Sequence, residues 1–191
     1  SADMLTRVGG NASTIQSGGS LNVDSRAGNQ ALSTAEGLTA GVVGIGVVTS
    51  DAIAGATLSN AAANTYTSDS LSSAVASGTT VTADGVRVNA TALNNARSTT
   101  QASGLGAVNY GGTDSSAISA QTLNASVAGN LTAAHDIQIT AWSTGGAVAD
   151  ALAQNIGLVA SVGKSTANAR LAPTLYVTTG MNTRLTAGGG I

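Results

Sequence analysis

The sequence predicts an all-β protein, a repetitive and elongated β-solenoid of the β-helix-like kind, and three observations lead to that prediction. Apolar residues alternate with polar ones over long stretches, which is the period of a strand and not of a helix. Related phrases recur about 51 residues apart, which is typical of repeat architectures. Charged residues make up 8% and aromatic residues 2% of the chain, with no Phe. Because the apolar content is mostly Ala and Val, we expect a thin, regular core between closely stacked strands.

The alternation separates an inner face from a solvated one. From Ile137 onward the odd positions are apolar, whereas Gln138 and Thr140 occupy the even side. In the preceding repeat the apolar phase lies on even positions, with Arg87 and Arg97 on the wet side. Strands place alternate side chains on opposite faces, so one face of each strand is predicted to be core. The predicted inner positions are Val86, Val88, Ala90, Ala92, Ala96, Ala102, Gly104, Gly106, Val108, Ile137, Ile139, Ala141, Ala147, Ala149, Ala151, Ala153, Ala167, Ala169, Leu171, Pro173, Leu175 and Val177.

The repeats define the expected organisation. Val81-Thr-Ala returns as Leu131-Thr-Ala and Leu185-Thr-Ala, and Ile137 follows Val86 by 51 positions (137 − 86). We expect a degenerate N-terminal repeat at 1–77 with an inserted loop near 59–73, repeats at 78–128 and 129–180, and the start of a further repeat at 181–191. All belong to one continuous solenoid, expected to be a segment of a longer chain. A repeat of this length fits either two coils or one broad flattened coil, and the sequence leaves both open.

Gly pairs and one proline punctuate these repeats. The pairs Gly18-Gly19, Gly111-Gly112 and Gly145-Gly146 are turn signals. Pro173 is the only proline and stands inside a strand-like run. It is expected at a strand start, or where the ladder does not need its missing N–H.

Composition excludes several classes of function. The chain has seven basic and nine acidic residues and a net charge of −2, so it lacks the basic surface that nucleic-acid binding needs. No apolar run approaches the roughly 18 residues that a membrane span needs, so no membrane insertion is predicted. Cysteine is absent, which rules out disulfides and thiolate sites. The 42% of apolar residues and the regular alternation argue against disorder.

No catalytic, cofactor-binding or metal-binding residue is predicted. His135 and Asp136 are adjacent in an expected turn but lack a third partner near in sequence. The Gly-rich piece from Gly41 to Gly46 is not followed by Lys-Ser/Thr, so its glycines indicate close backbone packing and not phosphate binding. The pairs Thr65–Thr67 and Thr80–Thr82 do not recur at one position of each repeat, as an ice-binding face would require. No enzyme activity and no cofactor are therefore expected.

Two phrases resemble a known family. Residues Ala167–Val177, with the phrase Leu185-Thr-Ala-Gly-Gly-Gly-Ile191, resemble the repeats of large bacterial leukotoxin-like and filamentous-haemagglutinin-like adhesin exoproteins. The likeness covers roughly 80–191 well and 20–58 loosely. It departs at Gln121–Leu123, where the proline is missing, and at the insertion near Asn60. It implies a secreted, surface-associated β-solenoid that adheres or builds matrix, with no catalytic residues to carry over.

The expected function is structural: a rigid fibre or stalk segment of a bacterial surface adhesin or biofilm matrix filament, located outside the cell. Its expected partners are more of the same protein, end to end, and cell-surface glycans or other matrix components. A carbohydrate-binding or carbohydrate-degrading β-helix of the tail-spike or lyase kind is the alternative. Such proteins usually show acidic clusters or aromatic platforms, and one Trp and three Tyr are few.

Overall fold

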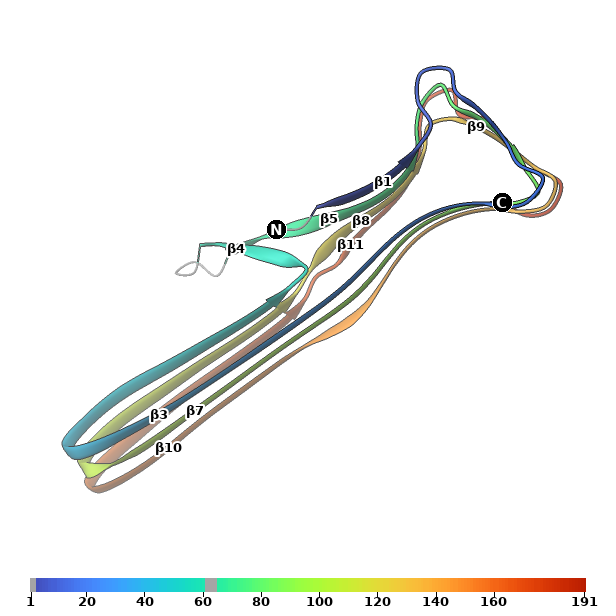
Figure 1. Ribbon diagram of the computed structural model, residues 1–191. Coiled ribbons are helices and arrows are strands. Elements are labelled where there is room, and N and C mark those ends of the chain that lie inside the picture. The colour runs from blue at the N-terminus through green and yellow to red at the C-terminus, as the bar shows by residue number, and fades with distance from the viewer. Residues whose placement is uncertain (1–2, 61–64) are drawn as a thin grey trace.

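The computed structural model describes residues 3–60 and 65–191, and these are all β, with no helix (Figure 1). This confirms that the protein is all-β, as predicted. The strands form three parallel sheets with the orders β1-β5-β8-β11, β3-β7-β10 and β2-β6-β9-β12, while β4 pairs antiparallel with β5. The strands are β1 (Met4–Val8), β2 (Thr14–Gln16), β3 (Leu21–Ala54), β4 (Ala56–Asn60), β5 (Thr65–Val75), β6 (Thr80–Ala83), β7 (Val86–Ser119), β8 (Gln121–Val127), β9 (Asn130–Ala133), β10 (Ile137–Leu171), β11 (Thr174–Thr179) and β12 (Leu185–Ala187).

The chain passes through the three sheets in the same order each time, and we call each passage a layer. The first layer is β1, β2 and β3, the second β5, β6 and β7, the third β8, β9 and β10, and the fourth β11 and β12. Side chains in register bond from layer to layer. Asn89 Nδ2 donates to Asp24 Oδ1, 65 positions earlier, and Thr140 Oγ1 donates to Asn89 Oδ1, 51 positions earlier. Parallel strands stacked this way make a β-helix-like fold.

The long strands β3, β7 and β10 form one sheet, and each of them doubles back on itself within its own layer (Figure 1). In β7, Ser115 Oγ donates to Ser98 Oγ over 2.8 Å, and Thr100 Oγ1 donates to the carbonyl of Asp114. In β10, the amide of Ala153 donates to Ser165 Oγ. The outgoing and returning halves therefore face each other and form a flat blade of two sheets. The ladder to the neighbouring layers is interrupted at the turn, with a register shift between Gly157 and Ala160, and resumes in the returning half.

Glycines occupy the fold-back of each of the three long strands. Gly41, Gly106 and Gly157 are in register with one another. A Cβ at Gly106 would overlap the carbonyl oxygen of Gly41, and one at Gly157 would overlap the carbonyl oxygen of Ala160. The chain can turn this tightly because no side chain stands between the stacked backbones.

The blade interior is built from small side chains. Ala52, Ala54, Ala96 and Ala117 form one buried cluster. Buried serines fill the spaces between, and their hydroxyls are bonded: Ser98 Oγ donates to the carbonyl of Ser50 over 2.7 Å. Two sheets that meet through Ala and Ser approach closely and exclude water, as in a dry zipper.

The other end of the stacked layers is a three-sided head (Figure 1). Its buried apolar residues are mostly larger than those of the blade. All three sheets contribute to its core, which consists of aliphatic side chains, whereas the interior of the blade consists of Ala and Ser. The buried cluster consists of Val23, Val75, Val81, Ala83, Val86, Val88, Ala125, Val127, Leu131, Ala133 and Ile137.

Two groups of predicted inner positions behave differently from the expectation. Val108 lies on the outer surface, 42% exposed, because the fold-back at Gly106 changes which parity points inward; Asn109 is buried in its place. The inner positions of the fourth layer and of the returning half of β10 are exposed, although their partners in the layer below are buried. Leu175 is 46% exposed, whereas Leu123, its register partner, is 0% exposed. Both β11 and the returning half of β10 are the last strands of their sheets, and no described strand is stacked above them.

The insertion in the first repeat is a hairpin and not the loop predicted near 59–73. Ala54 is joined to Asp69 through residues 55–68, while their register partners Ser119 and Gln121 are joined through Ala120 alone. Within the extra segment β4 pairs with the first residues of β5, and residues 61–64 of the expected loop lie outside the described residues. The Arg170 guanidinium lies 5.0 Å from the centre of the Tyr66 ring, so the hairpin contacts the third layer.

Pro173 lies at a strand start, one of the two places predicted for it. It precedes β11, which begins at Thr174, and it follows the last residue of β10, Leu171. Its register partner would be Gln121, the first residue of β8, so no ladder hydrogen bond within the sheet is lost.

Candidate functional site

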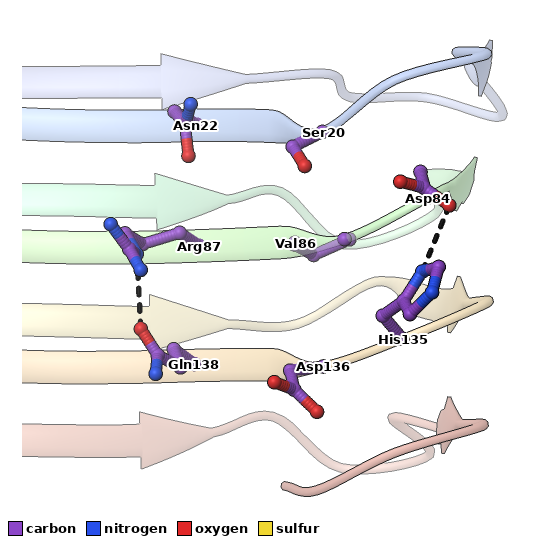
Figure 2. Close-up of a pocket in the computed structure, with 9 residues that line it drawn as sticks. Ser20, Asn22, Asp84, Val86, Arg87, His135, Asp136 and Gln138 are labelled. Atoms are coloured by element: carbon purple, nitrogen blue, oxygen red, sulfur yellow. Dashed lines mark hydrogen bonds and ion pairs between the residues drawn. The ribbon is translucent and has the colours of Figure 1, made fainter.

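A polar concavity of the described surface lies at the corner where β6 and β9 lead into β7 and β10 (Figure 2). It has a volume of about 430 Å³ and is open to solvent. His135 and Asp136, predicted to be adjacent in a turn, lie in the bend between β9 and β10. The main lining side chains are Ser20, Asn22, Asp84, Arg87, His135, Asp136 and Gln138.

The polar side chains of this corner bond from layer to layer. His135 Nδ1 lies 2.9 Å from Asp84 Oδ1, with both side chains at least half exposed. Arg87 Nε donates to Gln138 Oε1 over 3.0 Å (Figure 2). Asp136 Oδ1 accepts a hydrogen bond from the amide of Gly190. The bonds join the second layer to the third and the third to the fourth, so the corner is a polar seam along the stack.

The carboxylates of this corner do not gather into a metal site. Nowhere in residues 3–60 and 65–191 do three or more His, Asp or Glu side chains come together in a way that could hold a metal ion. Asp51, Asp114 and Asp150 lie elsewhere on the blade, and Asp150 contacts Arg97 at 3.6 Å. The geometry supplies contacts between layers, and His135 is paired with one carboxylate at an exposed position.

The second candidate site is the pair of open sheet edges at the two ends of the described stack. The strands β5, β6 and β7 pair with a neighbour on both sides, whereas β10, β11 and β12 pair only with the layer below and β1, β2 and β3 only with the layer above. An unpaired parallel edge presents a row of free N–H and C=O groups that another strand can pair with.

The side chains of these two ends continue the internal ladders. Leu71, Leu123 and Leu175 are in register, and the ladder begins with Met4 in the first layer. A second ladder runs from Ile15 through Val81 and Leu131 to Leu185. The top layer therefore offers leucines at positions that are fully buried one layer below, and the bottom layer offers Met and Ile at the same places.

At the lower end, Asp3 fixes the start of β1. Its Oδ1 accepts hydrogen bonds from the amide of Ser70 at 2.8 Å and from the Ser70 hydroxyl at 3.0 Å. The amide bond, and then the hydroxyl bond, lowers the pKa of Asp3 below its ordinary value because both stabilise the charged carboxylate.

Comparison with known proteins adds no relative. No family profile matches the chain, and no characterised protein and no solved structure shows significant similarity to it. Among residues 3–60 and 65–191 there is also no helix with the length and hydropathy that a membrane crossing requires.

One exposed apolar surface was not foreseen from the sequence. Val43, Ile45 and Val47 point outward from β3 and are 66–71% exposed. In the sequence, the segment Gly41–Val48 stands out mainly for its glycines. The signal that could have revealed the surface is the alternation itself, because Gly alternates with β-branched residues where a solvated strand would carry polar ones.

Proposed function

We propose that this chain is a structural segment of an elongated β-solenoid fibre, which extends by stacking further layers of the same kind on its open ends. The observation that carries the proposal is the contrast between Leu123, fully buried, and Leu175, its half-exposed register partner. A layer added on β11 would bury Leu175 as the second and fourth layers bury Leu123. Such burial contributes about 25 cal/mol for each Å² of apolar surface.

The two ends are suited to each other. If the lower end of a second copy follows the register of the internal layers, Met4 continues the Leu175 ladder and Ile15 continues the Leu185 ladder. The sheet β3-β7-β10 has no strand in the fourth layer of the described residues, so β10 stays unpaired on its upper side at this join. The join uses different surfaces of the two copies, so it is heterologous and open, and it gives fibres rather than closed rings.

The register between layers favours one broad flattened coil for each repeat over two coils. Thr140 bonds to Asn89, 51 positions earlier, and Thr113 bonds to Ser165, 52 positions later, both in directly adjacent layers. Side-chain hydrogen bonds and backbone ladders are the main connections between layers, and neither needs cysteine.

We also propose that the fibre works outside the cell, as a stalk of a bacterial surface adhesin or as a matrix filament. The resemblance of Ala167–Val177 to adhesin repeats supports this, as does a surface of Ser, Thr and Asn with few charges. Such a surface offers hydroxyl and amide groups that suit contact with cell-surface glycans. Durability would come from backbone pairing rather than from disulfides.

Sedimentation of the segment tests the stacking. The wild-type protein is expected to form concentration-dependent species much larger than a monomer. Leu175→Lys places a charge at the inner position of the top layer and should abolish these species. The matched control Thr178→Lys adds the same charge on the outer face of the same strand, at an exposed position, and should leave them intact. A folded wild-type monomer that stays dispersed at every concentration contradicts the proposal.

A further inference from the structure

We propose that the outer face of the blade beside the fold-back is a lateral contact surface, which packs face to face on the same surface of a second copy. The inference goes beyond end-to-end stacking and rests on it only where lateral area is added up along a fibre. We call this surface the tip patch. It consists of three in-register rows across three layers: Val43, Val108 and Ala160; Ile45, Tyr110 and Val162; and Val47, Gly112 and Lys164.

The alternation of the tip patch is inverted. Gly44 is buried and Gly46 half-buried inside the blade, while Val43, Ile45 and Val47 point outward. A sheet with one solvated face normally carries its apolar residues inside and polar ones outside. Here β-branched side chains stand where polar ones belong, and the inner positions hold glycine.

The interior could not accept these side chains. A Cβ on Gly44 would lie 2.9 Å from Asn109 Oδ1, and one on Gly46 would lie 2.7 Å from Thr39 Oγ1. Gly111 and Gly163, in register with Gly46, meet the amide group of Asn155 in the same way. The blade is too thin here to hold an aliphatic core, so the packing face of these strands is the outer one.

The patch has a sharp border along the strand. The next row on the same face is Thr49, Asp114 and Thr166, which is polar throughout. Within the patch, Lys164 at one corner is the only charged residue. On the fold-back side the apolar surface continues into the exposed Val42, Leu158 and Val159. A contiguous exposed apolar surface indicates a contact site, which singly scattered apolar residues do not.

Spacing and area identify the occupant as a second copy. Three strands about 4.8 Å apart and three rows over about 20 Å give a footprint of about 300 Å². A stable interface needs roughly 800 Å² on each partner, so one segment alone forms a weak pair. Four copies stacked in a fibre would present about 1,200 Å², which exceeds that need. A second fibre of this chain has the same strand spacing. Its strands can therefore align with those of the first fibre along the row of tip patches, and the two sheets can pack as in a sandwich.

Cross-linking of single-cysteine variants tests the lateral contact, because the natural chain has no cysteine. Tyr110 is the central position of the patch and meets its own counterpart whichever way the two copies are oriented. Tyr110→Cys should therefore give covalent dimers with a bismaleimide of about 10 Å span, the separation of two packed sheets. The control Gln101→Cys lies on the same strand, also exposed, but on the opposite outer face of the blade.

End-to-end neighbours place Tyr110→Cys and Gln101→Cys at equal distances from their own counterparts, so only lateral pairing favours the first. We expect several-fold more dimer from Tyr110→Cys, and a fall to the control level when Ile45→Lys is added. In the Leu175→Lys background the yield should drop but stay above that of Gln101→Cys, which separates this proposal from the stacking one. Equal yields for the two cysteines overturn the inference. So does co-sedimentation of the protein with phosphatidylcholine vesicles without cross-linking, since a lipid surface would then be the occupant.

Discussion

Single glycines decide whether the blade can close. At Gly106 the space that a Cβ would need is occupied by the backbone of the neighbouring layer, so a substitution strains two layers at once. At Gly28, on the outer face of β3, no atom lies within 4 Å of the place that a Cβ would take, so the same substitution meets only solvent. The fold therefore requires glycine at position 106 and not at position 28.

Gly106→Ala is expected to lower the free energy of unfolding by about 1–3 kcal/mol, the range for forcing an extra methyl group into a packed interior. Gly28→Ala is expected to leave it unchanged or raise it by up to about 1 kcal/mol, because alanine loses less backbone entropy on folding. Urea unfolding followed by circular dichroism measures both. Equal effects of the two substitutions would show that the fold-back does not depend on close backbone contact.

A carboxylate fixes the lower edge in a pH-dependent way. The pKa of Asp3 is lowered by the amide and hydroxyl of Ser70, so the contact is intact at pH values above the ordinary Asp range. It is lost as the pH falls through the lowered pKa. Hydrogen exchange of the β1 amides should therefore show protection that declines in acid. Asp3→Asn should show less protection near pH 5 and no comparable decline; an unchanged profile in that variant contradicts the role.

At the scale of elements, the hairpin is an addition to the stack and not part of its ladder. Asp69 N donates to the carbonyl of Gly55 over 3.0 Å, so the two ends of the extra segment are already adjacent. The outward-pointing Ile118 is only 3% exposed, and its register neighbour Arg170 meets Tyr66 of the hairpin. The hairpin thus lies against the outer face of the returning strands near their exit from the blade.

Deleting residues 56–68 should keep the layers folded, since Gly55 would then join Ala54 to Asp69 as Ala120 joins Ser119 to Gln121. We expect an unchanged far-ultraviolet spectrum and a modest loss of stability, comparable to that of Tyr66→Ala, from exposure of Ile118. Circular dichroism and urea unfolding check this. Loss of β structure in the deletion variant, with Tyr66→Ala still folded, would show that the hairpin is needed to form the first layer.

Most strands could be predicted, because apolar and polar residues alternate along the sequence, as in Ile137, Gln138 and Ile139. The fold-back could not, since it lies at single glycines such as Gly106, whereas the pairs Gly111-Gly112 and Gly145-Gly146, expected to mark turns, lie within β7 and β10. The hairpin was predicted as a loop because Asn and Ala, which are depleted in strands, separate Thr57 from Thr65-Tyr-Thr67, and because the segment has no counterpart in the other repeats. The exposure of Leu175 could not be predicted either, because it depends on what stacks above the residue and not on its neighbours in sequence.

At the scale of the whole molecule, the fold sets no limit to growth along its stacking axis. Each layer contacts only the layers beside it, so stability is a sum of layer terms and nearest-neighbour contacts. A middle layer has two such contacts and an end layer has one. The small side chains of the blade keep each contact modest, and the total therefore depends on how many layers are stacked.

This dependence gives the last prediction. If copies stack end to end, association stabilises the folded state by mass action, and the urea midpoint of the wild-type protein should rise with its concentration. In Leu175→Lys the added charge would have to be buried between two layers, at a cost of several kcal/mol, so the midpoint should not depend on concentration. Thr178→Lys carries the same charge outside the join and should behave like the wild type. A wild-type midpoint that is independent of concentration would mean that the open sheet edges do not bind another copy, even though their side chains continue the internal ladders.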